Sequence, residues 1–136
     1  MNIFIDTVAF LAVLNANDQF HPSARQVWEE ILSSDTPLVS SNYVILETIA
    51  LLQLHFGIEA VRMFEGDILP IVVISWVDET IHKQGMSALL AANRRSLSLV
   101  DCTSFEVMRQ AGLDTAFTFD PHFQELGFKV IPTTQA

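Results

Sequence analysis

The segment PIVVISW, residues 70–76, contains the clearest strand signal of the sequence. Ile71, Val72, Val73 and Ile74 follow one another in it, and branched aliphatic residues of this kind favour strands. A short run that is apolar at every position is typical of a parallel strand covered on both faces. The segment therefore predicts a parallel sheet.

Shorter strand-like runs alternate with longer segments of helical periodicity along the rest of the chain. The other predicted strands are residues 2–5, 37–40, 116–119 and 129–131. The predicted helices are residues 7–16, 21–32, 42–56, 58–68, 78–92 and 100–110, with a helical turn at 121–126. This alternation predicts an α/β fold with three layers, α/β/α, around a central parallel sheet of four or five strands. A chain of 136 residues fits one such domain, residues 1–136.

The composition argues against a membrane protein and against a disulfide-stabilised one. The longest uncharged apolar stretch before Asp78 is interrupted by Pro70 and is too short to cross a bilayer. The chain opens directly on a strand pattern, without a basic segment followed by an apolar block. Cys102 is the only cysteine, so no intrachain disulfide can form. We therefore expect a cytoplasmic protein.

Four acidic residues stand in apolar surroundings: Asp6, Glu47, Asp101 and Asp120. Asp6 and Asp120 end predicted strands, and Asp101 opens a predicted helix. In open parallel sheets, sites form beyond the carboxyl ends of the strands, where such residues gather. Glu47 lies in the middle of the apolar helix at residues 42–56, where no capping role applies.

Each aspartate also has a purely structural interpretation as a helix cap. Asp6 precedes a helix, Ser98 and Asp101 have the spacing of a capping box, and Asp120 is followed by Pro121. Burial of several charges together is nevertheless costly unless they are paired or bound to a metal. The chain has only seven Lys and Arg residues, none of them beside these acids in the sequence. A hard divalent cation, Mg²⁺ or Mn²⁺, is the expected partner of the carboxylates.

Around these acids the sequence resembles the PIN-domain family, and within it the VapC-like toxin branch. The resemblance rests on four segments in order: IFIDT (3–7), SNYVILET (41–48), SLVDCTSF (98–105) and AFTFDPHF (116–123). It implies a metal-dependent endoribonuclease that cleaves single-stranded RNA with metal-activated water, often dimeric and often controlled by a cognate antitoxin. Asp6, Glu47, Asp101 and Asp120 then match the catalytic and metal-binding acids.

The resemblance also assigns roles near the metal to two hydroxyl residues, Thr7 and Thr118, which we expect on the substrate side of the site. Some members carry a further acid just after the last motif aspartate, where this chain has His122, so the number of metals stays open. The net charge of −9 has the wrong sign for binding RNA. Arg94 and Arg95, shortly before Asp101, are the predicted contacts to the phosphate backbone.

Two other functions fit parts of the pattern. A receiver-like signalling domain would use an acidic pocket, with Asp78 as the phosphorylated residue and Lys129 after the last strand, but it has no need for Glu47. A catalytically idle PIN-fold binding module is the second alternative. The helix at residues 42–56 is apolar nearly all round, with Leu46, Ile49, Leu52 and Phe56 as exposed-face candidates, which favours a homodimer.

Overall fold

The central feature of the computed structural model, which describes residues 2–133, is one parallel sheet of five strands. The strands are β1 (Ile3–Ile5), β2 (Leu38–Ser41), β3 (Val72–Ser75), β4 (Thr115–Phe117) and β5 (Lys129–Ile131). Their order is β3-β2-β1-β4-β5, and every neighbouring pair is parallel. The predicted three-layer architecture is confirmed. The chain builds outward from β1 in one direction and then in the other, so the sheet reverses its order between β1 and β4, which is where such sheets bind ligands.

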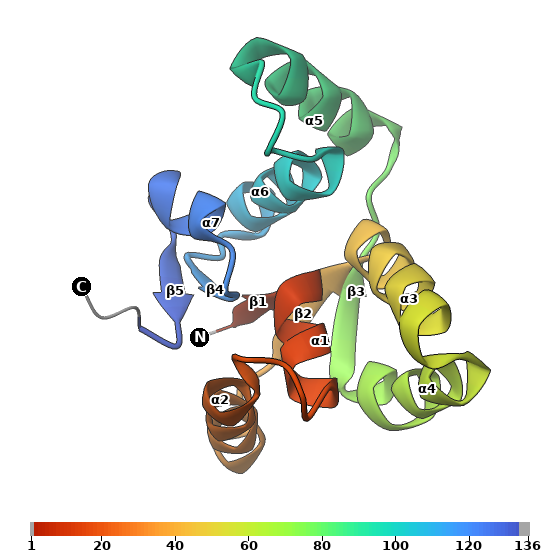
Figure 1. Cartoon of the computed structure of the whole chain (residues 1–136). Helices are drawn as coiled ribbons and strands as arrows, with labels where there is room; N and C mark the ends of the chain where they lie inside the picture. Colours follow the sequence, from red (N-terminus) through yellow and green to blue (C-terminus); the bar gives the residue numbers. More distant parts are fainter. Residues whose placement is uncertain (1, 134–136) are drawn as a thin grey trace.

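Helices cover the two faces of this sheet, as Figure 1 shows, with α6 and α7 on one side of the strands and α1 and α2 on the other. The α-helices are α1 (Thr7–Leu14), α2 (His21–Ser33), α3 (Asn42–Phe56), α4 (Ile58–Met63), α5 (Glu79–Ala92), α6 (Leu99–Ala111) and α7 (Pro121–Glu125). A π-helical turn (Phe64–Ile68) and a 3₁₀ turn (Leu69–Ile71) connect α4 to β3. Within residues 2–133, no helix combines the length and the apolar content that a bilayer span needs.

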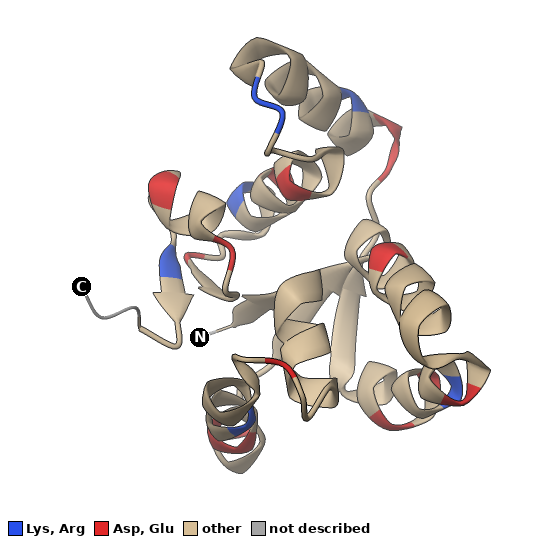
Figure 2. Cartoon of the chain, in the orientation of Figure 1, with Lys and Arg blue, Asp and Glu red and all other residues tan. Residues whose placement is uncertain are grey.

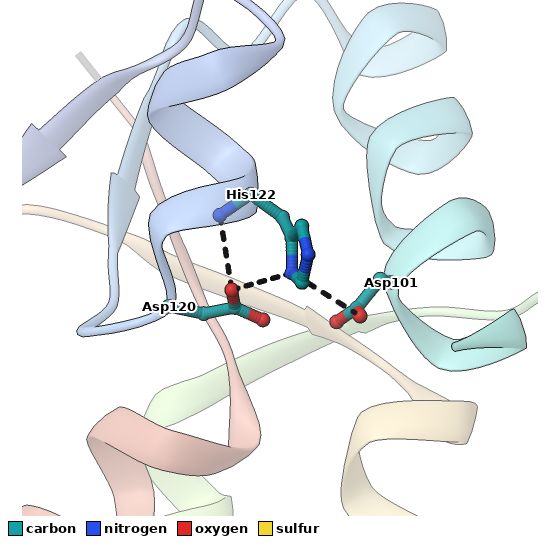
Figure 3. A group of neighbouring side chains, drawn as sticks. All are labelled: Asp101, Asp120 and His122. Atoms are coloured by element: carbon teal, nitrogen blue, oxygen red, sulfur yellow. Dashed lines mark hydrogen bonds and ion pairs between the residues drawn. The ribbon is translucent and has the colours of Figure 1, made fainter. Parts of the chain in front are cut away.

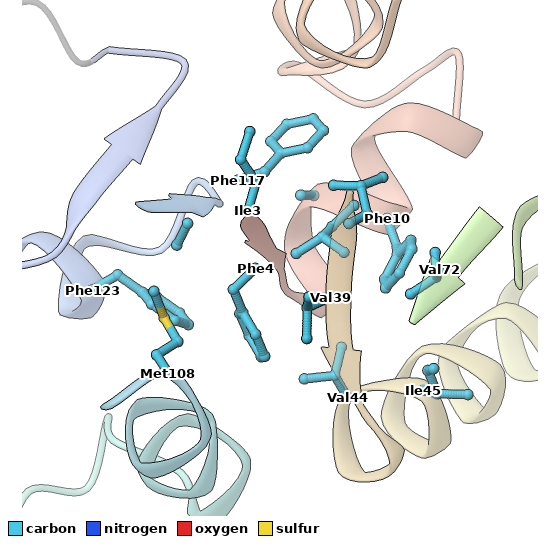
Figure 4. Close-up of a cluster of buried hydrophobic side chains, with 14 of the residues drawn as sticks. Ile3, Phe4, Phe10, Val39, Val44, Ile45, Val72, Met108, Phe117 and Phe123 are labelled. Carbon is cyan, nitrogen blue, oxygen red and sulfur yellow. The ribbon is translucent and has the colours of Figure 1, made fainter. Parts of the chain in front are cut away.

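The core consists of aromatic and aliphatic side chains on both faces of the central strands (Figure 4). On one face, Phe4 of β1 lies 6.3 Å from Phe123 of α7, measured between ring centroids. On the other, Phe10 of α1 meets the edge of Phe64 at 5.1 Å. Both faces of β1 are therefore filled, which holds the end of this strand, and Asp6 after it, in a fixed position.

Helix α5 packs on α6 and not directly on the sheet, so it forms an outer layer in Figure 1. The contact is close because Gly85 of α5 faces Thr103 of α6. A Cβ atom at Gly85 would lie 2.6 Å from the Thr103 methyl carbon. The glycine thus lets the two helix backbones approach, and this packing anchors the start of α6, where Asp101 lies.

The sequence placed every strand and helix, but several predicted boundaries and the predicted burial of one strand were wrong. The strand predicted at residues 70–76 begins at Val72, because Pro70 lies in the 3₁₀ turn and cannot donate a ladder hydrogen bond. This strand is at the sheet edge, and Val73 is 59% exposed, so the strand is not covered on both faces as predicted. The helix predicted at residues 58–68 is α-helical only to Met63, and the strand predicted at residues 116–119 ends at Phe117.

Of the four exposed-face candidates predicted on helix α3, Leu46 and Phe56 are exposed and the other two are not. Leu52 is fully buried, and Ile49 packs against the core. Leu46, Ala50 and Leu54 are exposed, and because they follow at intervals of four residues they form one stripe along the helix. We call these three residues the α3 stripe.

Candidate metal centre

The four predicted acids line one small cavity at the carboxyl end of the sheet, of about 180 Å³. Its wall consists of Asp6, Thr7, Val8, Glu47, Ser98, Val100, Asp101, Ser104 and Asp120. β1 to β4 themselves carry no charged residue, so the acids lie beyond the strands (Figure 2). A larger open groove of about 390 Å³, between α2 and the end of β5, is lined by none of these four acids.

Asp6 is the most buried of the four acids, with 6% of its surface exposed. It caps α1, because its Oδ1 accepts a hydrogen bond from the Ala9 amide at 3.2 Å. Burial raises the pKa of Asp6 to about 7, and the nearby carboxylates of Asp120 and Asp101 add to the rise. The bonds from Thr118 and Ala9 lower this pKa but do not cancel the effect of burial. The site therefore holds Asp6 poised between its neutral and charged forms near neutral pH.

Thr118, just after β4, connects Asp6 to Asp120. Its hydroxyl donates to Asp6 Oδ2 at 2.7 Å and accepts from the Asp120 amide at 2.9 Å. The side chain is buried and spans the point where β1 and β4 end side by side. Thr118 thus fixes the separation of two acids that come from opposite halves of the chain.

Asp101 and Asp120 both combine a capping position with a place in the cavity wall. Asp101 forms a reciprocal capping box with Ser98, with both bonds at 3.0 Å. Asp120 caps α7 and accepts from the His122 amide at 3.0 Å. The pKa of Asp101 is raised by burial in the first place, and the Asp120 carboxylate raises it further. Each of these two aspartates therefore both contributes to a helix cap and lines the cavity.

Glu47 enters the cavity from α3 and is only half buried. Within residues 2–133 the Glu47 carboxylate has no hydrogen-bond or ion-pair partner. Hydrogen bonds within the protein therefore do not explain why this acid lies in the cavity. Thr7 secures the helix that carries it. The Thr7 hydroxyl donates to the Val44 carbonyl and accepts from the Thr48 hydroxyl, both at 3.3 Å, which ties α1 to α3.

The two predicted phosphate contacts lie in the loop between α5 and α6 and differ from each other. Arg94 is held by Glu125 of α7 at 2.9 Å. Six of the seven basic side chains form ion pairs of this kind, none with the four cavity acids. Among residues 2–133, Arg95 is the one basic side chain without an ion pair, and it is exposed.

His122 is the residue of this site that the sequence did not place there. It is 9% exposed, and its Nδ1 lies 2.7 Å from Asp120 Oδ1 and 3.9 Å from Asp101 Oδ2 (Figure 3). The sequence signal was available, since His122 stands two residues after Asp120. Whether the side chain turned toward the acids depended on the first turn of α7.

The donor set fits a divalent cation. One oxygen each from Asp101 and Asp120 and one nitrogen of His122 all lie within 4.8 Å of one another. The pKa values of Asp6 and Asp101 are raised, first by burial and then by the neighbouring carboxylates, and the interaction of Asp101 with His122 does not cancel its rise. His122 Nδ1 is also buried without a hydrogen-bond partner in the described part of the chain. A bound cation would compensate the charges and occupy this unpaired nitrogen.

The receiver-like alternative is wrong, because its two residues lie at opposite ends of the sheet. Asp78 caps α5 beyond the carboxyl end of β3. Lys129 is the first residue of β5, at the amino end, where it lies 3.9 Å from Asp114. A lysine there cannot serve an acidic pocket at the other edge.

Comparisons with known proteins match these observations. The family model described as the PIN domain matches residues 3–129. The chain is 36% identical over 128 residues to the 23S rRNA-specific endonuclease VapC20 of Mycobacterium tuberculosis, covering 93% of this chain and 95% of that protein.

Solved structures give the same result. The crystal structure of M. tuberculosis VapC20, described as a sarcin-ricin loop cleaving toxin, superposes with a TM-score of 0.82 at 33% identity, covering 93% of this chain and 96% of that one. FitAcB from Neisseria gonorrhoeae has a TM-score of 0.70 at 18% identity, with 94% and 95% covered. A toxin–antitoxin complex from Klebsiella pneumoniae has a TM-score of 0.68 at 14% identity, with 99% and 100% covered. The last two likenesses concern the fold alone.

Proposed function

The chain belongs to the PIN-domain family, and we propose from this and from the acidic cavity that it is a metal-dependent endoribonuclease, the toxin of a toxin–antitoxin pair. The observation that carries the proposal is the convergence of Asp6, Glu47, Asp101 and Asp120 on one cavity at the switch point of the sheet. Substrate would be single-stranded RNA, and the cation Mg²⁺ or Mn²⁺.

The carboxylates have separable tasks in this proposal. Asp101 and Asp120 would hold the cation, and Asp6 and Glu47 line the same cavity. When bound, the cation would lower the pKa of a water molecule and neutralise charge developing at the phosphate. Asp6, with a pKa of about 7, is able to accept a proton near neutral pH.

The two threonines are proposed to act mainly on the acids and not directly on the substrate. Thr118 sets the separation of Asp6 and Asp120, and Thr7 sets the position of α3 and so of Glu47. Their hydroxyls are already bonded within the protein, which leaves them little capacity for an RNA phosphate.

Arg95 is the proposed contact to the RNA backbone, because it is exposed and carries no ion pair within residues 2–133. Arg94 would serve the same purpose only by leaving Glu125. This exchange costs little, since exposed ion pairs contribute about 0–1 kcal/mol.

The net negative charge of the chain favours binding of a specific RNA over general RNA binding. With a net charge of −9, phosphates are repelled except where the cation and the loop arginines offset the charge. The similarity to a 23S rRNA-specific endonuclease makes an rRNA loop the first substrate to test.

We also propose a homodimer formed through the α3 stripe, in addition to an antitoxin partner. Leu46 and Leu54 are 69% and 76% exposed, and a second copy of the stripe would cover them. The stripe lies on the same helix as Glu47, so dimerisation would also fix the wall of the cavity. A cytoplasmic location remains a prediction.

The decisive experiment is RNA cleavage by the full chain with Mg²⁺, Mn²⁺ or EDTA, comparing the wild type with Asp6→Asn. The substrates are a sarcin-ricin loop oligonucleotide and an unrelated single-stranded RNA. We expect cleavage that requires a cation, prefers the loop, and falls at least about 100-fold in Asp6→Asn, since even partners of ligands cost 10–100-fold. Metal-independent cleavage would contradict the role of the cation. No cleavage by a correctly folded wild type would instead favour the idle binding module.

A further inference from the structure

The first turn of α7 directs an imidazole into the acidic cavity. Asp120 caps this helix and Pro121 occupies its first position, so His122 follows the cap by two residues. The His122 amide donates to Oδ1 of Asp120, the residue that caps the helix, so His122 lies close to the Asp120 carboxylate. The ring is enclosed, and its Nδ1 faces the oxygens of Asp120 and Asp101 (Figure 3).

This nitrogen is close to carboxylate oxygens but lacks a hydrogen-bond partner. Nδ1 lies 2.7 Å from Asp120 Oδ1, a distance that gives an ion pair only if the imidazole is protonated, and the atom is buried without a hydrogen-bond partner in the described residues. The other ring nitrogen, Nε2, lies 3.4 Å from the Ser96 hydroxyl. In the tautomer that has its proton on Nε2, Nδ1 presents a lone pair to the two carboxylates, and only a cation between them makes this arrangement favourable.

We infer that His122 Nδ1 is a direct ligand of the cation held by Asp101 and Asp120, so that the centre is a mixed nitrogen–oxygen site that selects Mn²⁺ over Mg²⁺. The inference rests on the proposed metal-dependent function. Ligands at about 2.1 Å from a metal lie about 3 Å apart at right angles and about 4.2 Å apart across it. The observed separations from Nδ1, 2.7 and 3.9 Å, are of this size.

Selectivity follows from ligand chemistry. Mg²⁺ prefers carboxylate and water oxygens in octahedral arrangement, whereas an imidazole suits transition metals. The remote nitrogen supports this role, because a ligating histidine commonly donates its other N–H to a neighbouring group, here the Ser96 hydroxyl. A histidine that only positioned Asp120 would instead carry its proton on Nδ1 and leave the cation without a nitrogen ligand.

The first test is pulsed EPR of Mn²⁺ bound to the full chain, which needs no substitution. A directly coordinated imidazole couples its nitrogen nucleus to the electron spin of Mn²⁺. We expect a ¹⁴N coupling that changes to a ¹⁵N coupling when the protein is grown with ¹⁵N-histidine. Bound Mn²⁺ without any nitrogen coupling would overturn the inference.

The second test assigns the histidine. Titration calorimetry with Mn²⁺ and with Mg²⁺ would compare the wild type, His122→Asp and His55→Gln, whose histidine is exposed in the last turn of α3. We expect His122→Asp to lose the nitrogen coupling and to lower the ratio of Mn²⁺ to Mg²⁺ affinity at least about tenfold. His55→Gln should match the wild type. An unchanged ratio in a folded His122→Asp protein would contradict the assignment.

The same samples, assayed for RNA cleavage, separate the two proposals. Metal-dependent cleavage by a wild type whose Mn²⁺ shows no nitrogen coupling refutes the ligand role of His122 and leaves the ribonuclease function standing. Nitrogen coupling in a wild type that cleaves no RNA confirms the mixed site and refutes the proposed activity.

Discussion

The acidic cavity and the α3 stripe both hold side chains in unfavourable environments, but of opposite kinds. The cavity buries the carboxylate of Asp6, whereas the stripe exposes Leu46 and Leu54 to water. The cost in the cavity is electrostatic, so it depends on pH and is relieved by a small cation. The cost at the stripe is hydrophobic, so it grows with exposed area and is relieved only by another macromolecular surface.

The difference shows which partner each region requires. A point charge can be compensated at one position, and the ligand atoms of Asp101, Asp120 and His122 already lie within 4.8 Å of one another. An apolar stripe along a helix needs a partner of similar length.

Asp6→Asn should give the largest effect, and the effect should depend on pH. The pKa of Asp6 is about 7 in the folded protein and 3.8 as its ordinary value, so the folded state holds the proton more tightly. The resulting penalty is absent below pH 3.8, grows as the pH rises to about 7, and is constant above it. At pH 8 it amounts to about 4 kcal/mol.

In EDTA, therefore, Asp6→Asn should be more stable than the wild type by up to about 4 kcal/mol at pH 8 and equal to it near pH 4. Urea unfolding at several pH values measures this difference. Asp67→Asn, at an exposed acid, is the matched control and should show no such trend. A difference that does not vary with pH would mean that Asp6 is not buried as a titrating group.

Glu47→Gln removes a charge from the half-exposed side of the cavity, so metal-free stability should change by less than about 0.5 kcal/mol. Its effect should appear with metal. At a Mn²⁺ concentration 100 times its dissociation constant, the wild type gains about 2.7 kcal/mol. If loss of the ligand weakens binding about 100-fold, the gain falls to about 0.4 kcal/mol.

Thermal melts with Mn²⁺ and with EDTA measure these gains, and RNA cleavage should fall with them. Glu65→Gln, at an exposed acid in the π-helical turn, is the control. A Glu47→Gln protein that is destabilised without metal but fully active would show that Glu47 has a structural role and lies outside the metal site.

Thr118→Val keeps the shape of a buried side chain but removes the hydroxyl between Asp6 and Asp120. The Asp120 amide loses its acceptor and Asp6 loses a donor, so we expect a loss of about 1–3 kcal/mol. Without the bond from Thr118, which lowers its pKa, Asp6 should titrate at higher pH than in the wild type. Denaturant unfolding and a ¹³C NMR titration measure the two effects, and exposed Thr80→Val is the control. An unchanged Asp6 titration would argue against the bridge.

Leu54→Ser should change the stability of the single chain by only about 0.5 kcal/mol or less, because the side chain is 76% exposed. It should instead weaken the proposed dimer, since each buried leucine contributes about 1.5–3 kcal/mol. Sedimentation at tens of micromolar should find a dimer for the wild type and for Leu32→Ser, an exposed leucine on α2, and a monomer for Leu54→Ser. A monomeric wild type would contradict the dimer.

Local pattern sufficed for much of this structure. The apolar run that contains Val72 and Val73 and the helical periodicities predicted the parallel sheet and every helix, with errors mainly at boundaries such as Pro70. The convergence of Asp6 and Asp120 was also predictable, because parallel strands place their carboxyl ends at one edge of the sheet. These features depend on strand direction and on residue spacing, which the chain sets locally.

What the tertiary structure decided was the direction of side chains between segments far apart in the sequence. The sequence by itself specified which acids would gather, but not that Thr118 would bridge Asp6 and Asp120, nor that His122 would turn its unpaired nitrogen to Asp101. It specified that α3 is apolar, but not that Leu52 would be buried and Leu54 exposed. The physical reason is that burial and hydrogen bonding depend on which neighbour the sheet order places against each side chain, and this order is set by the packing of the whole chain.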